Sequence, residues 1–165
     1  WEPWARSRVT VEAGCGSCDR HRSAFGAVIG HGEIASRSPK MAMIVIAEDE
    51  FLIADMLAMY LEDAGHEPIV HPNGEAAFEY IRDKSVDLLI TDFMMPRMTG
   101  LELATAVRSD PAKCDLPIIL VSGAQTSIGR AHPALFDVVL DKPYSLEKLL
   151  KIAEDLIREG RPTSA

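Results

Sequence analysis

The sequence lacks the features that mark secreted, membrane-spanning and disulfide-linked proteins. Its longest uninterrupted apolar run, residues 41–47, is far shorter than the roughly 20 residues that a bilayer-crossing helix needs. No compact apolar segment with a small-residue cleavage site stands near the start, so no signal peptide is evident. Three cysteines do not make a disulfide framework. We therefore expect a cytoplasmic protein that makes no contact with a membrane.

Basic residues are scarce in the greater part of the chain. Residues 41–165 contain 11 Lys and Arg against 21 Asp and Glu, whereas residues 1–40 contain six and four. Because nucleic-acid phosphates are bound mainly by cationic side chains, we expect no direct contact with nucleic acid. An acidic domain is better suited to a small hard cation such as Mg²⁺.

The chain divides into parts of different character. Residues 1–40 show no sustained helical or strand periodicity, and we expect an irregular N-terminal extension outside the core fold. Residues 41–160 are expected to form the folded domain, and residues 161–165 a short tail.

The extension contains one Cys-x-x-Cys pair, Cys15 and Cys18, with His21 and His31 nearby. Such a group could bind zinc or act as a redox pair. No second Cys-x-x-Cys follows, and short motifs of this kind are weak predictors, so we favour ordinary thiols.

From residue 43 onward, short apolar runs alternate with amphipathic stretches. The apolar runs predict strands at residues 43–47, 67–71, 87–91, 116–122 and 137–141. The amphipathic stretches predict helices at residues 51–65, 74–82, 99–109 and 145–160, and a short helix broken near Pro133 within 123–136. This alternation predicts an α/β domain with a doubly wound, five-stranded parallel sheet and helices on both faces.

Polar side chains end or follow four of the five expected strands. Glu48 and Asp49 follow the first strand, Asp92 the third and Lys142 the fifth, while Ser122 ends the fourth. Parallel strands end at one edge of the sheet, so we expect these side chains to gather there. Each alone has an ordinary explanation as a helix cap, turn residue or solvated lysine, but their shared position favours a site.

The residue types at this edge suit phosphoryl chemistry. Clustered carboxylates repel one another unless a cation intervenes, and Mg²⁺ prefers oxygen ligands. An aspartate can attack phosphorus and form an aspartyl phosphate. The charge of the transferred group would be neutralised by Mg²⁺, the Lys142 ammonium and the Ser122 hydroxyl.

Four motifs, IVIAEDE, LLITDFMMPRMTG, PIILVSGA and LDKP, occur in this order between residues 44 and 143. In order and spacing they resemble the receiver domain of bacterial two-component response regulators. The resemblance implies a flavodoxin-like fold with strand order 2-1-3-4-5. It also implies a signalling phosphoprotein that catalyses no reaction other than its own phosphorylation and dephosphorylation.

The resemblance implies a role for each residue of the expected site. Asp92 would be the phosphoacceptor, Ser122 the switch hydroxyl and Lys142 the ion-pair partner of the phosphoryl group. The Mg²⁺ ligands would be Glu48, Asp49, Asp92 and the backbone carbonyl of Met94. In this family the Lys-Pro bond, here Lys142-Pro143, is typically cis.

One position departs from the family pattern. A Tyr or Phe that swings inward on phosphorylation usually stands three residues before the lysine, whereas this chain has Val139. Phe136 or Tyr144 could take over that part. Met94 and Ala124, two residues beyond the phosphoacceptor and the switch hydroxyl, lack groups to orient an attacking water, so we expect a long-lived phosphorylated state.

The implied partners are a sensor histidine kinase or histidine phosphotransfer protein and a downstream protein target. The face built from the fourth helix, fifth strand and fifth helix is the expected contact surface and a possible homodimer interface. Only residues 161–165 follow the last expected helix, which favours a stand-alone receiver. The alternative is the receiver part of a transcription regulator whose output domain lies outside this chain.

Two other classes fit less well. A hydrolase of the haloacid-dehalogenase type needs a second acid two residues after its aspartate nucleophile, and Met94 stands there. A phosphorylation-independent interaction module would not need Asp92, Ser122 and Lys142 together.

Overall fold

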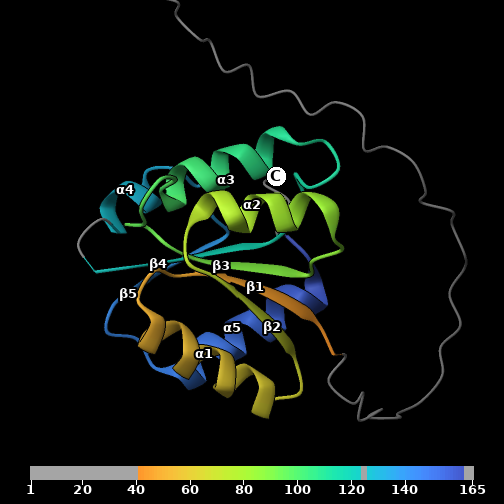
Figure 1. Cartoon of the computed structure of the whole chain (residues 1–165), viewed down its shortest axis with the longest axis vertical. Helices are drawn as coiled ribbons and strands as arrows, with labels where there is room; N and C mark the ends of the chain where they lie inside the picture. The colour runs from red at the N-terminus through yellow and green to blue at the C-terminus, as the bar shows by residue number, and fades with distance from the viewer. Residues whose placement is uncertain (1–40, 124–125, 162–165) are drawn as a thin grey trace, which may run out of the picture. The chain divides into compact units, whose positions relative to one another are not determined.

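The computed structural model describes residues 41–123 and 126–161, in which strands and helices alternate (Figure 1). The strands are β1 (Met43–Ala47), β2 (Glu67–His71), β3 (Leu88–Asp92), β4 (Ile118–Ser122) and β5 (Val138–Asp141). The helices are α1 (Phe51–Asp63), α2 (Gly74–Asp83), α3 (Gly100–Ser109), α4 (Thr126–Arg130) and α5 (Leu146–Glu159). No helix of this described part is long and apolar enough to cross a membrane.

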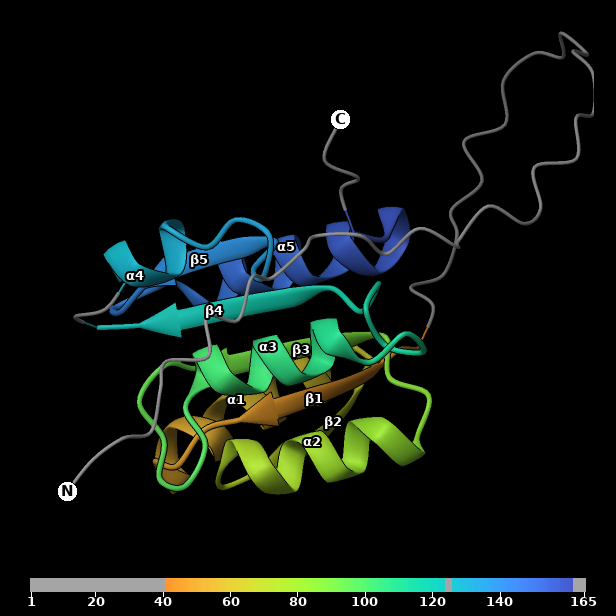
Figure 2. The same ribbon diagram turned by 90° about the horizontal axis from the view of Figure 1, so that it is seen from above.

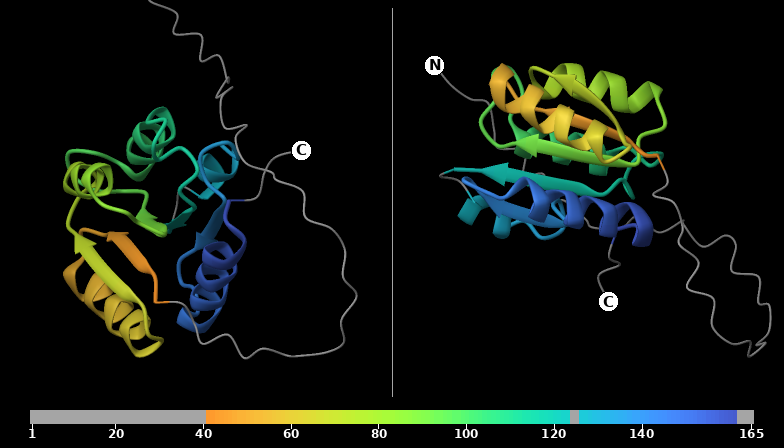
Figure 3. Two further views of the ribbon diagram at one scale, coloured as in Figure 1. Left: turned by 90° about the vertical axis from the view of Figure 1, so that its right-hand side faces the viewer. Right: turned by 90° about the horizontal axis from the view of Figure 1, so that it is seen from below.

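The five strands form one parallel sheet in the order β2-β1-β3-β4-β5. Helices α1 and α5 cover one face of the sheet, and α2, α3 and α4 cover the other (Figures 1 and 3). Both the doubly wound α/β fold and the predicted strand order are therefore confirmed.

The three central strands are buried on both faces, which explains their unbroken apolar sequences. Ile44 and Ile46 of β1 enter the core beneath α1 and α5, while Val45 and Ala47 enter the core beneath α2 and α3. Successive strand residues point to opposite faces, so one five-residue strand serves both cores.

The observed boundaries differ from the predicted ones at two informative places. β4 begins at Ile118 and not at 116, because Pro117 has no N–H and the Leu116 N–H bonds to the Lys113 carbonyl in a turn. β3 extends to Asp92, so the carboxylate is the last residue of the strand and not the first of the loop. The helix predicted within 123–136 is confirmed as the short α4.

A buried charge cluster lies near the opposite edge of the sheet, where the strands begin. The Asp137 side chain is only 2% exposed and accepts hydrogen bonds from Arg108 at 2.9 Å, Arg161 at 3.0 Å and the Ile118 N–H at 2.8 Å. Burial and the nearby Arg161 charge lower the pKa of Arg108 to about 10. Asp137 thus ties α3 and Arg161, which follows α5, to the sheet.

Replacing Asp137 with Asn should destabilise the fold strongly. The change would leave two substantially buried guanidinium groups without their shared anion, which costs about 3 kcal/mol. Urea unfolding of the variant and the wild type would measure the difference. Asp83→Asn, which breaks an exposed pair with Arg82, is the matched control and should cost less than about 0.5 kcal/mol. A loss of less than about 1 kcal/mol in the free energy of unfolding of Asp137→Asn would contradict this role of Asp137.

Candidate functional site

The carboxyl ends of the strands gather the polar residues singled out in the sequence. The arrowheads of the strands point to one edge of the sheet (Figure 2), and β3 lies between β1 and β4. Asp92 at the end of β3 is therefore central. Glu48 and Asp49 follow β1 on one side, and Ser122 ends β4 on the other.

Lys142 connects two of these carboxylates. Its Nζ lies 2.7 Å from Asp92 Oδ1 and 2.8 Å from Glu48 Oε2. Burial lowers the pKa of the Lys142 ammonium, but the hydrogen bonds and negative charge of Asp92 and Glu48 outweigh it and raise the pKa overall. Lys142 is therefore a fixed positive charge at this edge.

Glu48, Asp49 and Asp92 form an acidic cluster in which one oxygen from each lies within 4.8 Å of the others. Burial raises the pKa of Glu48, and the hydrogen bond and charge of Lys142 only partly oppose this effect. Lys142 brings one positive charge to a cluster of three carboxylates, so negative charge is left over. A donor set of oxygens with surplus negative charge fits Mg²⁺.

The loop after β3 holds the Asp92 side chain and backbone in place. The Met94 N–H donates to Asp92 Oδ2 at 2.6 Å, and the Thr91 hydroxyl donates to the Asp92 carbonyl at 2.9 Å. A Cβ at Gly100 would collide with the Asp92 carbonyl oxygen, so only glycine lets α3 begin so close to the site. Arg97, with φ of 69°, turns the loop back toward that helix.

Gly100 is a site residue whose importance the sequence alone did not reveal. A glycine eight residues after Asp92 is typical of an ordinary turn and by itself indicates no role in the site. The signal that could have identified it is Thr99, which caps α3 in a capping box with Glu102 and so fixes where the helix begins.

The ends of β4 and β5 join behind the site. Ser122 is 1% exposed and pairs in register with Asp141, and the Lys142 N–H donates to the Ser122 carbonyl at 2.8 Å. The Lys142-Pro143 peptide bond is cis, as the resemblance implied. Met94, two residues beyond Asp92, exposes 57% of its surface. Ala124, two residues beyond Ser122, lies outside the described residues.

The structure also places the aromatic residues near β5. Val139 is half-buried against Gly129 of α4, and Phe136 is packed in the core beneath α2 and α3. Tyr144 packs on the α5 side, and burial raises its pKa. Phe136 belongs to the same cluster as Val139, whereas Tyr144 belongs to the cluster on the other face of the sheet.

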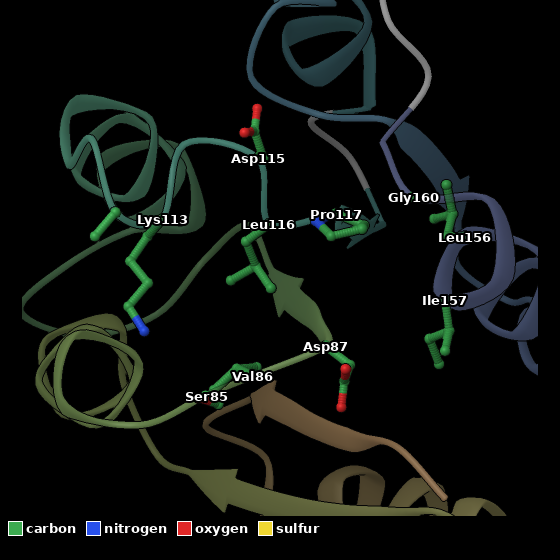
Figure 4. Close-up of a pocket in the computed structure, with 11 residues that line it drawn as sticks. Ser85, Val86, Asp87, Lys113, Asp115, Leu116, Pro117, Leu156, Ile157 and Gly160 are labelled. Carbon is green, nitrogen blue, oxygen red and sulfur yellow. The ribbon is translucent and has the colours of Figure 1, made fainter. Parts of the chain in front are cut away.

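A separate cavity of about 360 Å³ lies at the opposite edge of the sheet (Figure 4). It is lined by the loops before β3 and β4 and by the end of α5, including Asp87, Lys113 and Asp115. The Asp87 carboxylate accepts the Met43 N–H at 2.9 Å and so holds the start of β1. The cavity shares no residue with the acidic cluster.

The sequence profile of the response regulator receiver domain matches residues 44–154, and the chain belongs to this family. It is 32% identical over 117 residues to Response regulator RR06 of Streptococcus pneumoniae, with 70% of this chain and 52% of RR06 covered. It is 35% identical over 120 residues to the response regulator receiver protein CpdR of Brucella abortus, with 71% of this chain and 98% of CpdR covered. The chain thus spans about half of RR06 but nearly all of CpdR.

Solved structures show the same relationship. The response regulator TrrA of Thermotoga maritima, in complex with Mg²⁺-BeF, superposes with a TM-score of 0.64 at 28% identity. The match covers 70% of this chain and 99% of TrrA. The fold is therefore the flavodoxin-like fold of receiver domains, and the chain is a signalling domain.

Removing the Lys142 ammonium should strengthen Mg²⁺ binding. Lys142→Met would leave Asp92 and Glu48 without their shared cation, so a metal ion would gain roughly tenfold in affinity from the uncompensated charge. Calorimetric titration with Mg²⁺ would measure this, with Lys113→Met at the opposite edge as the control. Unchanged or weaker binding by Lys142→Met would show that the acidic cluster is not the metal site.

Proposed function

We propose that this domain acts in the cytoplasm and accepts a phosphoryl group on Asp92 from a phosphohistidine of a sensor kinase or phosphotransfer protein. The proposal is carried by one observation, the central position of Asp92 between the Lys142 ammonium and two further carboxylates. This arrangement supplies a nucleophile, a fixed cation and a donor set for Mg²⁺ within one edge of the sheet.

In the transfer, an Asp92 carboxylate oxygen forms a bond to phosphorus while the phosphorus–nitrogen bond of the donor breaks and imidazole leaves. Bound Mg²⁺ would neutralise part of the charge on the phosphoryl oxygens. Glu48, Asp49, Asp92 and the Met94 carbonyl are the proposed ligands. The related TrrA was solved in complex with Mg²⁺-BeF, which supports Mg²⁺ as the metal. The Met94 N–H orients the carboxylate through its bond to Oδ2.

After transfer, Lys142 would pair with a phosphoryl oxygen, and the Ser122 hydroxyl would donate to another. Both residues lie at the joined ends of β4 and β5, so the phosphoryl group would favour a conformer in which these ends are drawn inward. The face of α4, β5 and α5 would then present an altered surface to a downstream protein or to a second copy of the chain.

A receiver domain of this kind exists both alone and joined to output domains, and both remain candidates. CpdR, which the chain nearly covers, favours the stand-alone form. RR06, of which it covers about half, favours the receiver part of a longer regulator. The position of the stop codon in the gene would decide between them.

Incubation with Mg²⁺ and acetyl phosphate should add the mass of one phosphoryl group to the wild-type protein. Asp92→Asn should show no gain, because an amide is a poor nucleophile. Intact-mass spectrometry measures both, and removal of Mg²⁺ with a chelator should also prevent the gain. An undiminished gain in Asp92→Asn would sink the assignment of Asp92.

The phosphorylated state should be long-lived, since Met94 presents an exposed apolar side chain where a polar group could orient water. Met94→Asn, alone or with Ala124→Glu, should shorten the half-life of the phosphorylated protein several-fold. Loss of the phosphoryl mass over time would measure this. Met59→Asn, at an equally exposed methionine of α1, is the control and should leave the half-life unchanged. Equal half-lives for all variants would refute the role of Met94.

A further inference from the structure

Asp141, the last residue of β5, connects the site to helix α4. Its carboxylate accepts hydrogen bonds from the Arg130 guanidinium and the Thr126 hydroxyl, which lower the pKa of Asp141. Thr126 and Arg130 are the first and last residues of α4. One carboxylate therefore holds both ends of this helix.

Helix α4 has few other means of staying in place. At five residues it is far shorter than the roughly 12 to 15 at which an isolated helix becomes even marginally stable. Gly129 brings its backbone directly onto the Leu120 side chain, and a Cβ at Gly129 would lie 3.4 Å from both methyl carbons of Val139. The contact beneath α4 is thus small and aliphatic.

Val139 cannot swing inward on phosphorylation as the aromatic ring usual at this position would. It fills the space below Gly129 with two short methyl groups, and a β-branched side chain has restricted rotation about its first bond. The polar contacts of Asp141 are therefore the most direct link from the end of β5 to α4 among the described residues.

Asp141 is also linked to the phosphoryl site through the chain itself. It directly precedes Lys142, whose Nζ lies 2.7 Å from Asp92, and it pairs in register with Ser122. Any inward movement of Lys142 and Ser122 shifts the backbone that carries Asp141.

We propose that Asp141, with Thr126 and Arg130, is a positioning residue that holds α4 in the resting state and couples its placement to phosphorylation of Asp92. This inference rests on the proposed function. An exposed ion pair shifts an equilibrium by at most about fivefold, whereas couplings between sites reach roughly 5- to 150-fold. Phosphorylation can therefore overcome the restraint from this exposed ion pair, whereas a buried ion pair would be harder to break.

Hydrogen exchange of the α4 amides, followed by mass spectrometry, tests the proposal. Asp141→Asn and Arg130→Gln should raise exchange in the unphosphorylated protein by up to about fivefold. Arg130→Lys should preserve most of the protection. Arg158→Gln, which removes an exposed arginine paired with Asp155 and Glu159 on α5, is the matched control and should leave α4 unchanged.

The same measurement after treatment with Mg²⁺ and acetyl phosphate tests the coupling. Phosphorylation should change the hydrogen exchange of the α4 amides in the wild type. Arg130→Gln should reduce that change by at least half. This variant should take up the phosphoryl group as fast as the wild type. An equal change in both proteins, or no change in phosphorylated wild type, would overturn the coupling. Absence of phosphoryl uptake by the wild type would instead overturn the proposed function, and with it the coupling. The exchange rates of the unphosphorylated proteins would still decide whether Asp141 holds α4.

Discussion

The Lys142 ammonium, shared between the carboxylates of Asp92 and Glu48, is the interaction on which the site depends. Burying either carboxylate alone would be costly, and a single cation at 2.7 and 2.8 Å makes both tolerable. The same cation leaves surplus negative charge, because Asp49 joins the cluster. Pairing with Lys142 therefore lets the two carboxylates be buried, and the surplus negative charge makes the cluster a candidate site for Mg²⁺.

The two edges of the sheet use charge in opposite ways. At the edge where strands begin, Asp137 accepts three hydrogen bonds, two of them from arginines, and these tie α3 and Arg161 to the sheet. At the edge where strands end, carboxylates outnumber cations, and the exposed Arg130–Asp141 pair holds α4 only weakly. A rigid base and a loosely restrained helix are what a conformational switch requires.

Much of the fold follows from local pattern. Buried parallel strands must be apolar on both faces, so β1, β3 and β4 were recognisable from unbroken apolar runs. Asn73 and Ser145 cap α2 and α5 through short-range hydrogen bonds that the sequence also reveals. The predicted start of β4 at residue 116 is wrong because the Leu116 N–H bonds to the Lys113 carbonyl in a turn, a contact that the apolar run does not reveal.

The sequence by itself determined which polar residues end or directly follow the strands, and so identified Glu48, Asp49, Asp92, Ser122 and Lys142 as candidates. Only the tertiary structure decided that Lys142 pairs with Glu48, 94 residues away, as well as with Asp92. It also decided that Gly100 must lack a side chain and that Asp141 reaches α4. The physical reason is that strand and helix patterns act over a few residues, whereas ion pairs and close backbone contacts depend on the distances that packing imposes.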